Sequence, residues 1–309
     1  MGIAENIKKR RLELGLSQQE LASILGYKSR STINKIEAGE NAVPEVKIAL
    51  FAKALDTTPE YIRTGGGADA GIRERAVPTG KKTVAVILAG GKSTRNLQNI
   101  PNQFINVLGK PVILYVLEAY EKHPAVDEIY VVCLKNWEDI VAAYAKQYGI
   151  TKLTGIIPAG ETGILSVKSA VDHLASRCGA EDTVLIQEST RPLITEEIIS
   201  KLLHCTGNAI ICEKMDDYMQ VAVEGGSKSY LDRDKVFAIQ SPEKYSYGCL
   251  REAFETASRE GHTFSETTCG ELIHKLGYSA FLCEGNHNNI KVVRQEDIAI
   301  LNALLKQML

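Results

Sequence analysis

The sequence of 309 residues contains no apolar run long enough to cross a bilayer. Its longest runs, residues 84–89 and 129–134, fall far short of the ~20 apolar residues that a transmembrane helix requires. Met1 leads directly into a charged helical pattern, without the apolar segment of a secretory signal. We therefore expect a protein that neither spans a membrane nor is secreted.

The sequence also lacks any Cys-x-x-Cys pair. Its seven cysteines are an odd number and are scattered between Cys133 and Cys283. This spacing argues against a disulfide framework and against a structural zinc site. A reducing compartment is expected, and the cytoplasm is the predicted location.

A strong charge of one sign is absent as well, because the formal net charge is only −2. The hydrophobic fraction of 44% and the charged fraction of 24% are typical of globular proteins. Residues 1–64 carry ten Lys/Arg and eight Asp/Glu, whereas the rest of the chain carries 26 and 30. The mildly basic first part permits DNA binding without requiring it.

Changes of pattern divide the chain into three parts. Residues 1–64 repeat apolar side chains at spacings of three and four, which predicts a small all-α domain. Residues 65–82 are rich in glycine and predict a flexible linker. Residues 83–309 alternate short β-branched runs with amphipathic helices, which predicts an α/β domain with a mostly parallel sheet. The predicted strands are 83–89, 128–134, 153–157, 183–187, 208–212 and 278–283.

Two short helices joined by a turn are predicted within the first domain. Ser17 and Glu20 form a capping box at the start of the first helix, and Gly26 ends it. A second helix is predicted from Ser31 to Ala38 and is stopped by Gly39. This is the pattern of a helix-turn-helix unit, whose second helix enters the major groove of DNA.

The segments Leu16 to Ala22 and Ser31 to Gly39 resemble the repressor-like family of helix-turn-helix domains, which includes the phage Cro and repressor group. The resemblance covers the whole first domain. It implies binding to double-stranded DNA, although such domains also serve as docking or dimerisation modules. By this resemblance the DNA-facing residues are Gln18, Lys28, Arg30, Ser31, Thr32, Asn34 and Lys35.

A glycine-rich segment follows the first predicted strand of the second domain, where residues 86–95 read VILAGGKSTR. Glycines let backbone N–H groups approach phosphates, and Lys92 and Arg95 can neutralise phosphate charge. The spacing is not that of a Walker loop. By itself the segment indicates only phosphate binding.

Further motifs give this segment a context. Together with Pro101-Asn102-Gln103-Phe104, it resembles the sugar-nucleotide-type nucleotidyltransferases, and more narrowly the cytidylyltransferases of methylerythritol phosphate or ribitol phosphate. The resemblance continues over essentially all of residues 83–309 through Ala159-Gly160-Glu161, Gln187 to Pro192, Gln240-Ser241-Pro242, Ser265-Glu266-Thr267 and Asn289-Ile290-Lys291.

The resemblance implies a Rossmann-like fold and a Mg²⁺-dependent reaction of CTP with a small alcohol phosphate, which gives a CDP-alcohol and pyrophosphate. The nucleotide-binding positions it implies are Leu88, Ala89, Gly90, Gly91, Gly160, Glu161, Ser166 and Ser189. The catalytic positions are Arg95, Lys291, Glu188 and Lys92, and Glu188 is also the expected metal ligand. The acceptor-binding positions are Asp217, Tyr218, Arg233, Ser241 and Ser265.

Residues 214–235 resemble the protruding arm of that family, which crosses to a second subunit and completes the acceptor site there. Asp217, Tyr218 and Arg233 are the matching positions, and Arg233 is expected to bind the acceptor's phosphate through its guanidinium group. A homodimer is therefore implied. It would also suit two helix-turn-helix heads on a two-fold operator.

The sequence departs from the family at several positions around the reacting phosphates. Asn102 replaces the lysine of the family's Pro-Lys-Gln motif, and losing one such donor typically costs ~10²–10³ in rate. Lys92 in the neighbouring loop is a candidate substitute. Tyr218 and Gly163 also differ from the methylerythritol enzymes. The natural acceptor is therefore left open between a polyol phosphate, a phosphonate and an amino-alcohol phosphate.

Three functional hypotheses follow. The first is an active cytidylyltransferase with a DNA-binding head. The second is a transcription regulator that uses a catalytically weak transferase domain as a ligand sensor. The third is an active enzyme whose head only mediates assembly.

Overall fold

A computed structural model of the chain describes residues 2–13, 16–27, 29–55, 57, 59–64, 81–92, 100–223 and 226–308. The chain divides into two compact units, residues 1–79 and 80–309, and each is a separate body with its own core. No helix in these ranges is long and apolar enough to cross a membrane.

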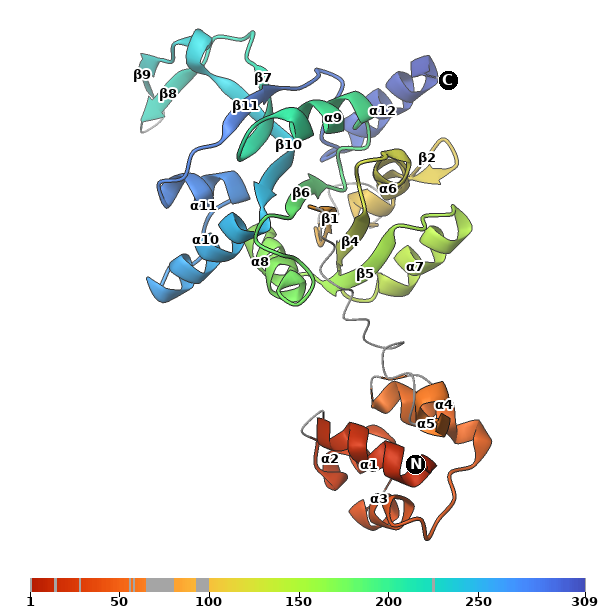
Figure 1. Cartoon of the computed structure of the whole chain (residues 1–309). Helices are drawn as coiled ribbons and strands as arrows, with labels where there is room; N and C mark the ends of the chain where they lie inside the picture. The colour runs from red at the N-terminus through yellow and green to blue at the C-terminus, as the bar shows by residue number, and fades with distance from the viewer. Residues whose placement is uncertain are drawn as a thin grey trace. The chain divides into compact units, whose positions relative to one another are not determined.

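All regular secondary structure among the described residues of the first unit is helical (Figure 1). Its core contains Leu21, Ile33, Phe51 and Ile62, which come from four different helices. The five helices are α1 (Ile3–Glu13), α2 (Gln18–Ile24), α3 (Arg30–Glu37), α4 (Glu45–Ala54) and α5 (Pro59–Thr64).

The local signals predicted from the sequence are present in this unit. The Ser17 hydroxyl accepts from the Glu20 backbone N at 3.2 Å, and the Glu20 carboxylate accepts from the Ser17 N at 2.7 Å. Gly26 and Gly39 have φ of +72° and +75°, which favours glycine after each helix. The capping box and both predicted helices are confirmed.

The second unit is built on a seven-stranded sheet in the order β11-β7-β10-β6-β1-β4-β5. Every neighbouring pair is parallel except the two that involve β10, which runs antiparallel to both neighbours. The strands are β1 (Thr83–Ala89), β4 (Glu128–Cys133), β5 (Leu153–Pro158), β6 (Thr183–Glu188), β7 (Ala209–Lys214), β10 (Phe237–Ser246) and β11 (Phe281–Glu284).

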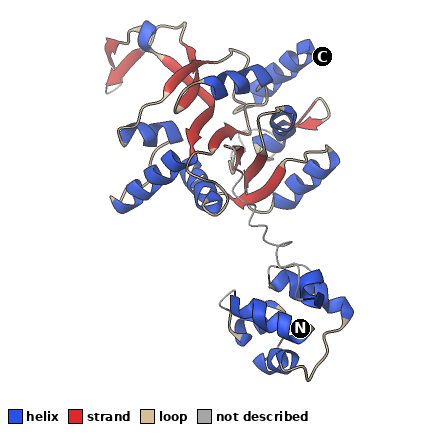
Figure 2. Cartoon of the chain, viewed as in Figure 1, coloured by secondary structure: helices blue, strands red, loops and turns tan. Residues whose placement is uncertain are grey.

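Helices cover both faces of this sheet (Figures 1 and 2). One face packs against α6 (Val112–Lys122), α7 (Glu138–Gln147) and α9 (Glu196–His204). The other packs against α8 (Gly163–Leu174), α10 (Tyr247–Arg259) and α11 (Cys269–Lys275). Burial on both faces explains why β1 and β4 are almost continuously apolar.

The remaining elements lie around the sheet. A short 3₁₀ turn η2 (Asn102–Phe104) precedes the hairpin β2 (Asn106–Val107) and β3 (Lys110–Pro111), and α12 (Gln295–Met308) packs beside it through a third apolar cluster. A second hairpin, β8 (Gln220–Val223) with β9 (Gly226–Tyr230), and the turn η3 (Arg233–Lys235) lie in the segment predicted to be the arm.

All six predicted strands are present, but β10 was not predicted. Its sequence is polar and contains Pro242, so it carries neither the alternation nor the β-branched run that marked the others.

At the boundary between the predicted linker and the second unit, Lys82 belongs to the folded unit rather than to the linker. Its backbone N donates to Asp182 at 3.0 Å and its ammonium pairs with the buried Glu128 at 3.2 Å.

Candidate active site

A cleft of about 590 Å³ opens where β1, β5 and β6 end. Ligands of open α/β sheets bind at this carboxyl edge of the strands. Eleven of the residues predicted for the transferase site line the cleft: Leu88, Gly90, Gly91, Lys92, Gly160, Glu161, Ser166, Glu188, Ser189, Ser241 and Lys291.

Close backbone packing forms the side of the cleft above β1 and β5. A Cβ on Gly90 would lie only 2.5 Å from the Cβ of Ala159, so the loop after β1 can reach the end of β5 only with glycine there. The buried Gln103 side chain fixes this loop, because its Nε2 donates to Ala89 O and Gly91 O, both at 2.9 Å. The two bonds therefore fix the backbone of the loop where Gly90 and Gly91 line the cleft.

Ser166 completes this glycine-lined side. Its hydroxyl accepts from the Gly160 N at 3.1 Å and donates to the Thr162 O at 2.9 Å. A hydroxyl has one donor and two acceptor positions, so one acceptor position is left for a ligand. Gly160 is needed because a Cβ would come within 2.6 Å of the Leu165 backbone.

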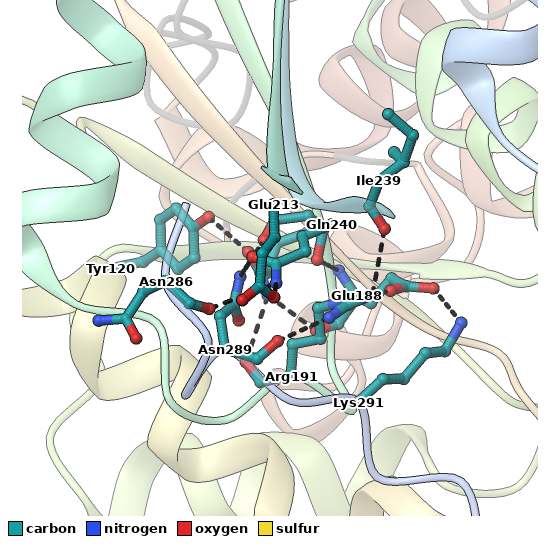
Figure 3. Close-up of polar contacts among 11 residues, drawn as sticks. Tyr120, Glu188, Arg191, Glu213, Ile239, Gln240, Asn286, Asn289 and Lys291 are labelled. Atoms are coloured by element: carbon teal, nitrogen blue, oxygen red, sulfur yellow. Dashed lines mark hydrogen bonds and ion pairs between the residues drawn. The ribbon is translucent and has the colours of Figure 1, made fainter. Parts of the chain in front are cut away.

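Charged side chains form the opposite side, above β6 and β10. The Glu188 carboxylate at the end of β6 forms ion pairs with Lys291 through Oε1 and with Arg191 Nε at 2.9 Å through Oε2 (Figure 3). Burial raises the pKa of Glu188, but Lys291 and Arg191 outweigh it, so the pKa lies below its ordinary value. Glu188 is therefore ionised at neutral pH, and its ion pair with Arg191 fixes the start of the loop after β6.

The chain that carries Lys291 is fastened on both sides. Arg191 donates to the Asn289 O at 2.6 Å, and the buried Asn289 side chain donates to the Ser241 O at 2.8 Å and to Gln240 Oε1 at 3.1 Å (Figure 3). Beyond Lys291, the Val292 N donates to the Thr190 O at 2.8 Å. The position of the ammonium group therefore depends on the loops after β6 and β11.

Asn102 holds the same segment from the other side of the cleft. It is 3% exposed, and its Nδ2 donates to the Val293 O at 2.9 Å and the Val292 O at 3.3 Å. These two bonds engage both amide hydrogens, so this side chain positions the chain next to Lys291 instead of donating to a phosphate.

Glu243 lines the cleft but was not predicted. It lies on β10 beside Ile186 of β6, and its Oε2 accepts from the Tyr245 hydroxyl at 2.6 Å and from the Gly270 N at 2.9 Å. The only sequence signal was an acid two residues after Ser241 in the Gln-Ser-Pro motif. Further lining residues that the sequence did not single out for the site include Gln103, Thr162, Thr190, Gln240 and Thr268.

Several predicted residues do not line the cleft of this chain. Ala89 is buried and Ser265 is exposed, and neither is among the residues that line the cleft. Asp217, Tyr218 and Arg233 lie on the arm, where the guanidinium of Arg233 lies 5.5 Å from the centre of the Tyr218 ring. Their service to a second subunit stays a prediction. Arg95 and Lys28 lie outside the described residues.

The donor set at the cleft suits Mg²⁺ better than a softer ion. No group of three or more His, Cys, Asp or Glu side chains gathers among the described residues, so no all-protein cage is present there. Mg²⁺ is commonly bound by one or two carboxylates together with substrate phosphates. Glu188 offers an ionised carboxylate at the point where the glycine-lined side meets the charged side.

The first unit presents a polar face on α3. Ile33, Ile36 and Glu37 face the core, and the Glu37 carboxylate forms a buried ion pair with Arg11 at 2.6 Å. Gln18 donates to Glu37 at 2.9 Å and to Asn34 at 3.3 Å, which joins α2 to α3. Among the predicted DNA-facing residues, Arg30, Ser31, Asn34 and Lys35 are exposed and Thr32 is half-buried.

This fold defines an α/β protein with a glycine-lined and charged cleft at the carboxyl edge of its sheet, preceded by a helix-turn-helix unit. A family model described as 2-C-methyl-D-erythritol 4-phosphate cytidylyltransferase (IspD) matches residues 83–307, and a helix-turn-helix model matches residues 7–62. The chain therefore belongs to the 2-C-methyl-D-erythritol 4-phosphate cytidylyltransferase family.

Similar proteins carry two kinds of name. A ribitol-5-phosphate cytidylyltransferase of Lacticaseibacillus paracasei is 30% identical, over 72% of this chain and 97% of the relative. One of Vibrio parahaemolyticus is 32% identical over 72% and 95%. A 2-C-methyl-D-erythritol 4-phosphate cytidylyltransferase of Clostridium novyi is 29% identical over 74% and 98%.

A solved structure, the 4-diphosphocytidyl-2C-methyl-D-erythritol synthase of Anaerococcus prevotii, resembles the chain with a TM-score of 0.62 and 23% identity. It covers 73% of this chain and 99% of its own. At this identity the likeness shows the fold.

Proposed function

We propose that this protein transfers the cytidylyl group of CTP to a small polyol phosphate and releases pyrophosphate. The observation that carries the proposal is one cleft that joins a glycine-lined side to the Glu188–Lys291 pair. Family membership and the names of the relatives, which act on ribitol 5-phosphate or 2-C-methyl-D-erythritol 4-phosphate, support the same acceptor class.

In the proposed reaction an oxygen of the acceptor's phosphate attacks the α-phosphorus of CTP. A bond forms between them, and the bond from the α-phosphorus to the oxygen bridging the β-phosphate breaks, so pyrophosphate leaves. A phosphate monoester has a second pKa of ~6, so the attacking oxygen needs no general base at neutral pH. The protein's task is to position the two phosphates and neutralise their charge.

The residues of the cleft divide this task. Gly90 and Gly91 offer backbone N–H groups, and together with Gly160 they allow close approach of the nucleotide. Lys291, held by the Asn102 and Arg191 contacts, balances charge on the reacting phosphates. Glu188 would hold Mg²⁺, which supplies further charge neutralisation to the triphosphate when bound.

Two cations complete the proposed site. Arg95 would bind the triphosphate, as the family motif implies. Lys92 lies at the cleft and would supply the charge that Asn102 does not. We expect Lys92→Ala to lower turnover by ~10²-fold, in the range of a lost transition-state donor. Unchanged turnover would remove Lys92 from this role.

The direct test measures pyrophosphate release by the full-length protein with Mg²⁺. CTP, UTP, ATP and GTP are each paired with ribitol 5-phosphate, 2-C-methyl-D-erythritol 4-phosphate, phosphocholine and aminoethylphosphonate. Release with CTP and a polyol phosphate is expected. Binding of CTP without release with any acceptor would contradict the proposal and favour the sensor hypothesis.

We also propose that the arm, residues 214–235, joins two copies of the chain and brings Asp217, Tyr218 and Arg233 to the partner's cleft. The arm exposes large apolar side chains, of which Tyr218 is 78% and Tyr230 69% exposed. Large apolar side chains that are exposed close together are typical of interaction surfaces, and all of these belong to one short segment. Measurement of the mass in solution should show that the wild-type protein is a dimer. The Arg233→Ala variant should still form the dimer but should have a higher KM for the acceptor.

For the first unit we propose binding to double-stranded DNA through α3. Its exposed face carries Arg30 and Lys35, placed as in a recognition helix that contacts base edges and phosphates. Binding should weaken steeply with salt, and Lys35→Ala should reduce the slope by ~1. Lys306→Ala in α12, an exposed lysine of the other unit, is the matched control. Weak binding with no salt dependence would favour a head that only mediates assembly.

A further inference from the structure

Glu243 occupies the side of the cleft that is not lined by glycine. In the sheet order, the glycine loops follow β1 and β5, whereas Glu243 lies on β10, between Ile186 of β6 and Ile210 of β7. It is 7% exposed and lines the same cleft as Glu188 and Lys291. If the nucleotide occupies the glycine-lined side, Glu243 faces the molecule that receives the cytidylyl group.

The Glu243 carboxyl group is held by one oxygen only. Oε2 accepts from the Tyr245 hydroxyl and the Gly270 N, whereas Oε1 has no hydrogen-bond partner among the described residues. Gly270 can approach so closely because it lacks a side chain, as a Cβ there would lie 2.7 Å from Ile210 Cδ1. The carboxyl group is therefore fixed in orientation, with one oxygen left for a ligand.

The charge surroundings of Glu243 differ from those of Glu188. Within the described ranges no Lys, Arg or His forms an ion pair with Glu243, whereas Glu188 has two cations. Burial raises the pKa of Glu243 to about 7, although the bonds from Tyr245 and Gly270 lower it, and the charge of Glu188 raises it further. Near neutral pH this carboxyl group can both accept and donate a hydrogen bond.

The fold does not need an acid at this position. The two bonds to Oε2 are ones that a neutral amide oxygen could also accept. Burying a carboxyl group without a cation costs stability. The unpaired oxygen at the cleft points to recognition of a ligand.

We infer that Glu243 hydrogen-bonds a hydroxyl on the carbon chain of the acceptor and so selects a polyol phosphate of sufficient length. The inference rests on the proposed function and adds a residue that reads the acceptor's chain rather than its phosphate. Hydroxyl recognition by a buried polar group discriminates strongly against analogues that lack the hydroxyl, because the group is then left unpaired.

The test compares kcat/KM for ribitol 5-phosphate, erythritol 4-phosphate and glycerol 3-phosphate at saturating CTP. Glu243→Leu should lower kcat/KM by ~10–100-fold for the longest acceptor that the wild type uses, in the range of a lost bond to a charged group. The loss should shrink as the chain shortens, and the KM for CTP should not change. Glu243→Gln should keep most of the activity, because an amide can still bond a hydroxyl.

Tyr247→Phe is the matched control. It removes a buried hydroxyl that donates to the Val171 O at 3.1 Å, contacts neither oxygen of Glu243 and does not line the cleft, so it should lower stability and leave the ranking of acceptors intact. If Glu243→Leu does not fold, as judged by its thermal transition, Glu243→Gln and a Glu243→Ala variant carry the comparison.

Three outcomes would overturn the inference. An equal loss of kcat/KM for all acceptors in Glu243→Leu would mean that Glu243 has a structural role. A raised KM for CTP in this variant would place the nucleotide on this side of the cleft. A loss in Glu243→Gln confined to an amino-alcohol phosphate would mean that the carboxylate pairs with an ammonium group. A wild type inactive with every acceptor would instead contradict the proposed function, which keeps the two failures distinct.

Discussion

The two sides of the cleft are built by different means. The side above β1 and β5 consists of backbone brought close by Gly90 and Gly160, with Ser166 and Gln103 holding the loops. The side above β6 and β10 consists of side chains, among which Glu188 and Lys291 form an ion pair although they lie 103 residues apart in the sequence. The first side depends on the absence of Cβ atoms, and the second depends on charge placed by distant segments.

The largest effect should come from the charged side. Lys291→Met removes the cation paired with Glu188 and proposed to neutralise the phosphates, so kcat should fall by ~10²–10³-fold. The measurement is steady-state pyrophosphate release, with CTP binding followed separately. Lys168→Met is the control, since Lys168 belongs to an exposed pair with Asp172 on α8. A variant that keeps kcat but loses CTP affinity would assign Lys291 to binding alone.

The second effect is on the pH dependence of the free energy of unfolding, and it distinguishes Glu243 from Glu188, the other carboxyl group of this side. The pKa of Glu243 is about 7 in the folded protein against 4.5 for an ordinary glutamate, so between these values unfolding releases a proton. Its contribution to stability is therefore complete below pH 4.5 and is lost as the pH rises through 7. By linkage the loss is on the order of 3 kcal/mol.

Glu243→Gln should lack this dependence. Denaturant unfolding of the 80–309 unit should be measured at several pH values. Between pH 4.5 and 8 the free energy of unfolding of the variant should rise relative to that of the wild type. The ionisable groups whose charges act on Glu243 are Tyr245 on its own strand, Glu188 on β6 and Cys269 on α11. They are the same in both proteins, so the difference isolates Glu243. Parallel pH curves would show that Glu243 is ionised in the folded state.

The same contrast explains what the sequence could reveal. Gly90, Gly91 and Gly160 lie in short contiguous motifs, and the strands beneath them are apolar runs buried on both faces, so pattern and motif suffice. Glu243 belongs to a polar strand interrupted by Pro242, whose place between β6 and β7 depends on pairing across the sheet. Local pattern does not encode that pairing.

Asn102 shows the same limit at a single residue. Its motif identified the position and the missing charge, but its amide hydrogens bond the backbone of Val292 and Val293, 190 residues or more away. A side chain's partners at such separation are set by the folded chain. The predicted arm residues illustrate the remaining gap, because their assignment to an acceptor site depends on the proposed dimer.

On the glycine-lined side, two adjacent glycines allow a matched test. Gly90→Ala would place a Cβ 2.5 Å from Ala159, whereas the nearest atom to a Cβ on Gly91 is 4.0 Å away. Gly90→Ala should cost ~1–3 kcal/mol of unfolding free energy, as overpacking does. Gly91→Ala should cost well under 1 kcal/mol. Equal costs, measured by denaturant unfolding, would show that the loop after β1 can move away from β5.

The smallest effect is expected at Ser166, where this side depends on a hydrogen bond. Ser166→Ala leaves the Gly160 N without its partner, and a neutral hydrogen bond contributes ~1 kcal/mol, or about a fivefold change in an equilibrium constant. The KM for CTP should rise by about that factor while kcat and the acceptor's KM stay close to the wild type. The measurement is initial rate against CTP at saturating acceptor.

Ser169→Ala supplies the control, because Ser169 lies three residues after Ser166 on α8 and its hydroxyl, within the described part of the chain, bonds the Leu165 O alone, at 3.0 Å. It does not line the cleft, so its variant should leave both KM values unchanged. If Ser166→Ala raised the acceptor's KM instead, the acceptor would lie on the glycine-lined side and the nucleotide on the charged side. The glycine loop would then bind the acceptor's phosphate, and Glu243 would face the nucleotide, which the acceptor series would reveal independently.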